Sequence, residues 1–149
     1  MHSFATKFTT ALLVATSVMA AAEQAEQQPP LSAHQQLLSD LWDDHTKYEF
    51  SPDHKSTSDT MATMTSNPHV NHVPTMVGAV GGPAVAAFYE QHFIFANPDM
   101  NLSPVSRTIG SASLVDEMII SLVHDRPVPW LLPGVEPTGK KLEIGRAHV

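Results

Sequence analysis

The sequence predicts an α+β domain in which three helices pack on one face of a curved antiparallel sheet. Helical patterns dominate residues 31–93 and strand patterns dominate residues 101–144, an order that favours this class. The 149 residues, 42% of them apolar and 15% charged, suit one globular domain. A net charge of −7 with eight basic residues argues against a nucleic-acid partner.

The lack of cysteine excludes disulfides and a cysteine nucleophile.

Residues 1–22 have the pattern of a secretory signal peptide. "MHSFATK" carries one lysine, and "FTTALLVATSVMAAA" is apolar apart from Thr and Ser and ends in small residues. The run is shorter than the roughly 20 residues of a membrane span, so no membrane association is expected once it is removed. We therefore expect a secreted protein with residues 23–30 as a polar linker. A mitochondrial presequence, which is usually richer in Arg, is the alternative.

The first helix is predicted over residues 31–50, with Ser32 as its N-cap. One narrow face holds four side chains at helical spacing, with Leu41 close by: Leu38, Trp42, His45 and Glu49. A short second helix is predicted over "TMATMT" (60–65), ended by Asn67-Pro68.

The next segment predicts a strand, a turn and a third helix. "HVNHVPT" (69–75) has strand composition, "MVGAVGGP" (76–83) reads as a glycine-rich turn, and Pro83 opens the helix. One helix face is expected to hold Val85, Phe88, Tyr89, His92 and Phe93.

Strands are predicted over 101–110 and 111–124, joined by a Gly-Ser turn. A Pro-rich connection (125–139) leads to a further strand starting at "KKLEI" (140–144).

His45 and Glu49 are ionisable residues in phase with apolar ones. Buried together they could act as a base and its orienting group. Equally, both could sit at the helix end and reach water as an i,i+4 pair.

Arg107 alternates in phase with Val105 and Ile109, so it is expected to face inward. Asp116 and Glu117 on the next strand are its candidate partners, and only one of them can face in. The sequence leaves open which one. A structural ion pair is the preferred role for the arginine, and anion binding is the alternative.

His72 shares a strand face with Val70 and Pro74, and His124 shares one with Met118, Ile120 and Leu122. Either histidine could line a cavity or be hydrogen-bonded core. His69 and His72 are three apart on a strand and point to opposite faces, so no metal site is expected.

Several blocks, in order, resemble the SnoaL-like branch of the nuclear transport factor 2-like superfamily. They are "LWDDHTKYEF", "MATMTSNPHVNHVPTMVGAVGG", "FYEQHFI", "SRTIG", "LVDEMI" and "WLLPGVEPTGK", spanning about Leu37 to Glu143. The resemblance implies a cone-shaped, strongly bent sheet wrapped around three helices and enclosing an apolar pocket. Members include polyketide cyclases, ketosteroid isomerases and dehydratases, and others only bind ligands or dimerise. A hydrolase label common in this branch needs a cysteine nucleophile, which this chain lacks.

The resemblance also implies two further strands after "PTGK". The final "EIGRAHV" instead looks like a reading frame through a sequencing adapter. We therefore expect an incomplete domain over 31–144, with its final strands missing, and a tail at 145–149 foreign to the natural protein. A genuinely short protein is the alternative.

Two functions are predicted. The first is proton-transfer chemistry (isomerisation, cyclisation, dehydration or hydrolysis) on a small apolar carbonyl compound, without a cofactor. The second is a non-catalytic module that binds a small ligand, with exposed sheet forming a homodimer face. Candidate catalytic residues are His45, Glu49, His72, Arg107, Asp116, Glu117 and His124. Candidate substrate-binding residues are Trp42, Tyr89 and Trp130.

Overall fold

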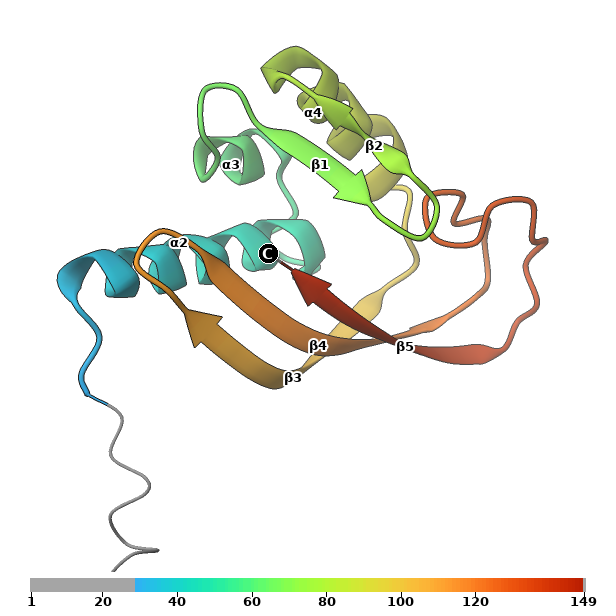
Figure 1. The fold of residues 1–149 in the computed structure, drawn as a ribbon. Coiled ribbons are helices and arrows are strands. Elements are labelled where there is room, and N and C mark those ends of the chain that lie inside the picture. The colour runs from blue at the N-terminus through green and yellow to red at the C-terminus, as the bar shows by residue number, and fades with distance from the viewer. Residues whose placement is uncertain (1–28, 149) are drawn as a thin grey trace, which may run out of the picture. The chain divides into compact units, whose positions relative to one another are not determined.

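The computed structural model describes residues 29–148, with side-chain surroundings for 29–145. The chain divides into residues 1–31 and residues 32–149, and all elements below belong to the second unit. Within the described residues this unit contains three α-helices, one π-helix and two antiparallel sheets, which confirms the predicted α+β class (Figure 1). The predicted signal peptide, and all of the linker but Pro29 and Pro30, lie outside the described residues.

Helix α2 (Ala33–Phe50) begins two residues after the start of the predicted range 31–50, and the predicted N-cap Ser32 is confirmed. The Ser32 hydroxyl accepts the Gln35 amide proton at 3.3 Å, and the Gln35 side chain accepts the Ser32 amide proton at 3.0 Å. This capping box satisfies two of the amides that a helix start leaves free. Gln35 also donates to the carbonyl of Ile109 at 2.9 Å, which ties the first turn to a strand end.

The Ser32→Ala variant is expected to lower the free energy of unfolding by about 1 kcal/mol, because one capped amide loses its acceptor. Urea denaturation followed by circular dichroism measures the change. Ser111→Ala, in an exposed turn, is the control and should stay within about 0.5 kcal/mol of the parent protein. Equal effects of the two substitutions would show that the cap contributes nothing.

Helix α3 (Thr57–Ala62) starts three residues earlier than predicted. The Ser56 hydroxyl accepts the amide proton of Asp59 at 3.2 Å and acts as N-cap. The helix therefore covers residues 57–59, which the predicted range of 60–65 left out, and Met64 lies beyond its end.

The prediction of a glycine-rich turn at 76–83 is wrong. Strand β1 (His69–His72) pairs antiparallel with strand β2 (Val77–Val80), and Asn71 lies opposite Gly78. A Cβ atom on Gly78 would stand 1.9 Å from the Val70 carbonyl oxygen, so the glycine permits close strand approach. Val77 and Ala79 pack against the core, which gives β2 the alternating burial of a half-exposed strand.

The third helix is α-helical over α4 (Gly82–Phe88) and continues as the π-helix η1 (Tyr89–Phe93). Its first residue is Gly82, one position before the predicted Pro83. The wider π turn shifts the helical phase, so Phe93 and Ile94 are buried while His92 is exposed. The expectation that His92 shares the buried face is therefore wrong.

The larger sheet has the order β3-β4-β5, all antiparallel. Strands β3 (Met100–Ile109) and β4 (Leu114–Val123) form the predicted hairpin, with a register shift between Pro104 and Ser106. Strand β5 (Lys141–His148) pairs with β4 and runs past Ile144, where the sequence suggested the strand breaks off.

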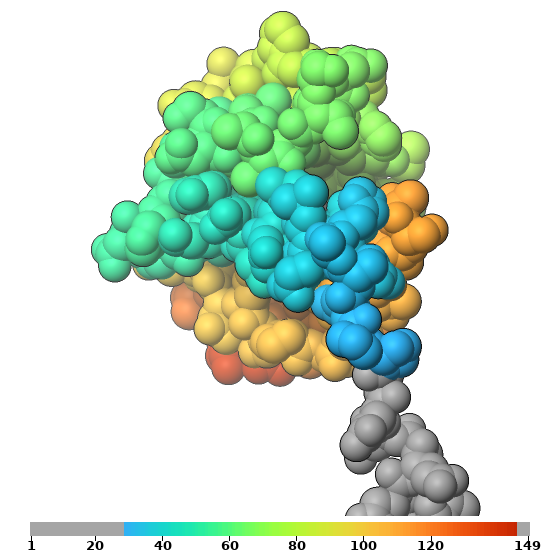
Figure 2. Space-filling model, turned by 90° about the vertical axis from the view of Figure 1, so that its left-hand side faces the viewer, coloured from blue at the N-terminus to red at the C-terminus, as the bar shows by residue number. Residues whose placement is uncertain are grey.

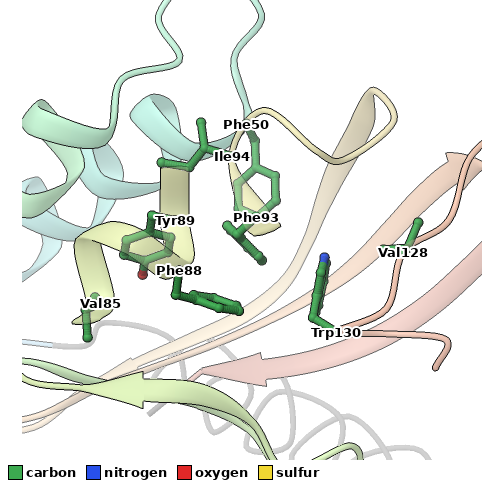
Figure 3. Close-up of a cluster of buried hydrophobic side chains, with 8 residues drawn as sticks. All are labelled: Phe50, Val85, Phe88, Tyr89, Phe93, Ile94, Val128 and Trp130. Carbon is green, nitrogen blue, oxygen red and sulfur yellow. The ribbon is translucent and has the colours of Figure 1, made fainter. Parts of the chain in front are cut away.

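Helix α2 lies between the larger sheet and the segment formed by α3 and β1, as two views at right angles show (Figures 1 and 2). The main core cluster draws residues from α2, α4, η1 and the 124–140 connection, and Figure 3 shows Phe88, Phe93 and Trp130 close together in it. A second cluster on β4 comprises Met118, Ile120 and Leu122, with Trp42 and Leu142 packed against it.

Candidate functional site

A pocket of about 510 Å³ lies among α2, the β1-β2 hairpin, η1, β4, β5 and the 124–140 connection. Its volume is in the range of small-molecule sites. The walls are mostly apolar and aromatic, and the polar groups come from a few side chains. The lining residues discussed below are Trp42, His45, Glu49, His72, Tyr89 and Trp130.

His45 and Glu49 form a buried acid–base pair on the pocket wall. The two residues are 8% and 4% exposed, and His45 Nε2 lies 3.0 Å from Glu49 Oε1. The alternative in which both reach water at the helix end is therefore wrong. Trp42, His45 and Glu49 recur at helical spacing on one face of α2. The helix therefore places both ionisable side chains on the wall of the pocket.

His45 is held from three further directions. Its ring stacks on Trp42 with 5.4 Å between centroids, and its Nδ1 lies 2.7 Å from the Thr63 hydroxyl. The Tyr89 hydroxyl, delivered by η1, lies 3.4 Å from Nε2. A ring fixed this way presents its ionisable edge in one orientation, which is what proton transfer requires.

His72 lines the same pocket from β1. Its Nδ1 donates to the Val77 carbonyl at 3.0 Å, because a carbonyl oxygen can only accept. The ring lies 4.5 Å from Trp130 and 5.5 Å from Phe93, centroid to centroid. Trp130 in turn donates its indole proton to buried Asn97 at 2.7 Å. His72 therefore sits in an aromatic wall, with its tautomer set by the hairpin backbone.

Arg107 lies opposite Asp116 and its guanidinium reaches α2, but the residue itself is exposed and lies outside the pocket lining. The expected phase with Val105 is wrong, since Val105 is 62% exposed and the register shift between Pro104 and Ser106 interrupts the alternation there.

The Arg107 guanidinium binds Asp116 at 3.0 Å, Asp43 at 2.8 Å and the Ser39 hydroxyl at 2.9 Å. The hydrogen bond to Asp116, assisted by Asp43, raises the pKa of the guanidinium against the opposing effect of burial. These contacts join α2 to the β3-β4 hairpin, which favours the structural ion pair over anion binding.

Asp116 and Glu117 lie on opposite faces of β4, as strand alternation requires. Asp116 is 5% exposed and also accepts the Trp42 indole proton at 2.5 Å. Glu117 is exposed on the other face, where the Ser106 hydroxyl donates to it. Asp116 is thus the inward partner of Arg107. Neither carboxylate lines the pocket, so the expectation that a strand carboxylate reaches the site is not met.

His124 is buried in phase with Met118, Ile120 and Leu122, as predicted, but it does not line the pocket. Its Nδ1 lies 3.3 Å from the Thr138 hydroxyl. This contact joins the end of β4 to the Pro-rich connection, so His124 belongs to the core.

The pocket therefore gathers three of the seven predicted catalytic residues and all three predicted substrate-binding residues. Arg107, Asp116, Glu117 and His124 lie elsewhere. Sequence reasoning missed Thr63, which touches His45, and Asn97, which holds Trp130. No local pattern marks either residue, because both partners are distant in sequence.

A scan against protein-family models finds no match, and searches of curated proteins and of solved structures find no similar protein. Among the described residues, none of the helices has both the length and the apolar character needed to span a lipid bilayer.

Proposed function

We propose that this chain is a secreted small-molecule pocket protein of the SnoaL-like type that catalyses proton transfer on a small apolar carbonyl compound. The observation that carries the proposal is the buried His45–Glu49 pair on the wall of a mostly apolar pocket. Ionisable groups are costly to bury, and they concentrate where proton chemistry occurs. The family assignment, with its cone-shaped sheet, rests on the order of the sequence blocks and on the α+β class.

The proposed chemistry uses side chains alone. The apolar walls of Phe93, Ile120 and Leu131 would hold the hydrocarbon part of the substrate. The polar edge formed by His45, Glu49 and the Tyr89 hydroxyl would face its carbonyl group. Isomerisation, cyclisation and dehydration of such compounds share one step, the movement of a proton on or next to the carbonyl, and a carboxylate–imidazole pair suits that step.

Exchange of α-hydrogens for deuterium tests that shared step without knowledge of the natural substrate. A panel of small cyclic and aliphatic ketones is incubated with the protein in heavy water, and deuterium uptake is followed by proton NMR. We expect uptake faster than in buffer for the ketones that fit the pocket. Uptake at the buffer rate for every ketone, by protein with a cooperative melting transition, would contradict catalysis.

A non-catalytic binding protein is the second candidate. It is favoured by the contacts of His45, since both ring nitrogens already have protein partners. Both tryptophans of the chain, Trp42 and Trp130, line the pocket. Binding of the same ketones should therefore quench tryptophan fluorescence. Saturable quenching with no deuterium uptake supports binding alone, whereas quenching together with uptake supports catalysis.

A further inference from the structure

The hydroxyl of Thr63 settles which nitrogen of His45 carries a proton. Thr63 Oγ1 lies 2.7 Å from the carbonyl oxygen of Thr60 and 2.7 Å from His45 Nδ1. A carbonyl oxygen only accepts, so the single hydroxyl proton of Thr63 is donated to Thr60. Towards His45 the hydroxyl can then only accept, and His45 Nδ1 must be the donor.

The protonation of Nδ1 also limits which protons His45 Nε2 and Glu49 can hold. Nε2 lies 3.0 Å from Glu49 Oε1, a distance at which a proton must stand between them. With Nδ1 already protonated, that proton makes either an imidazolium beside a carboxylate or a neutral imidazole beside a carboxylic acid. In both forms the pair carries no net charge, which lowers the cost of its burial at 8% and 4% exposure.

We propose that Thr63 is a positioning residue that holds a proton on His45 Nδ1, so that the proton shared by His45 and Glu49 at the pocket wall is a second one and the pair carries no net charge. Thr63 is itself anchored, because its amide also donates to the Thr60 carbonyl at 3.1 Å. The end of α3 thus orients a side chain of α2. The shared proton rests on geometry alone, and only its delivery to a substrate carbonyl rests on the proposed function.

Long-range proton–nitrogen NMR on the full chain labelled with nitrogen-15 histidine tests the assignment at neutral pH. The His45 signals are identified by their absence in a His45→Gln variant. We expect Nδ1 to resonate as a protonated nitrogen in the parent protein and in Thr63→Ser, which keeps the hydroxyl. In Thr63→Val the acceptor for the Nδ1 proton is gone, while Glu49 still shares a proton with Nε2, so the Nδ1 signal should shift to the unprotonated range.

Two results would overturn the proposal: an unprotonated Nδ1 in the parent protein, or an unchanged Nδ1 signal in Thr63→Val. Thr63→Ala, which also lacks the hydroxyl, replaces Thr63→Val if the melting transition of the latter is lost. The readout needs no turnover. Failure of deuterium exchange with a protonated Nδ1 would therefore count against the proposed catalysis and leave the role of Thr63 standing.

Discussion

Replacing His45 with glutamine is expected to slow α-deuterium exchange by about 10²–10⁴-fold, the usual contribution of a positioned acid or base. His45 is the residue through which Glu49, Thr63 and Tyr89 meet at the pocket. Glutamine keeps an amide that can donate to Glu49, so the carboxylate is not left without a partner, but it cannot exchange a proton at neutral pH. The initial rate of deuterium uptake, measured by NMR with the fastest ketone, gives the ratio.

The matched control is His34→Gln, the same chemical change at an exposed position of the same helix. It should leave the rate of uptake unchanged, since His34 lies outside the pocket lining. Equal rates for the parent protein and His45→Gln, with both proteins folded by circular dichroism, would remove His45 from the chemistry. Ketone binding by tryptophan fluorescence should survive in His45→Gln, because the apolar walls are unchanged.

Helical spacing predicted the part of the site that comes from one element. Trp42, His45 and Glu49 lie on one face of α2, and the apolar residues Leu38 and Trp42 in the same phase indicated that this face packs against the rest of the domain.

The phase of β4 likewise showed that only one of Asp116 and Glu117 could face inward. Asp116 is in phase with Met118, Ile120 and Leu122, but Glu117 is in phase with Ile119 and Val123, so both faces of β4 hold apolar residues. The apolar pattern therefore did not show which face α2 and the core would cover.

The errors also have physical causes. Gly78 looked like a turn residue, because a glycine selected for close approach of two strands cannot be told from one selected for its backbone freedom. His92 was misplaced because a π turn alters the helical phase by one residue. Thr63 was missed because it acts through a contact with His45 on another helix. The sequence patterns of α2 and α3 do not show how the two helices pack.

Replacing Asp116 with alanine is expected to lower the free energy of unfolding by about 2–4 kcal/mol. Breaking a buried ion pair costs about 3–5 kcal/mol. The value here is reduced because the Arg107 side chain is 29% exposed and keeps Asp43 as a partner. The variant also leaves the Trp42 indole proton without its carboxylate acceptor. Urea denaturation followed by both circular dichroism and tryptophan fluorescence measures the loss.

Glu117→Ala is the control, since it removes a carboxylate from the adjacent residue on the exposed face of the same strand. It should change the free energy of unfolding by no more than about 0.5 kcal/mol. If the two variants lost equal stability, the network of Arg107, Asp116 and α2 would not be what joins that helix to the sheet. If only Asp116→Ala loses stability, the helix that carries His45 and Glu49 is held in place by that network, and the position of the pocket wall depends on residues that never touch the pocket.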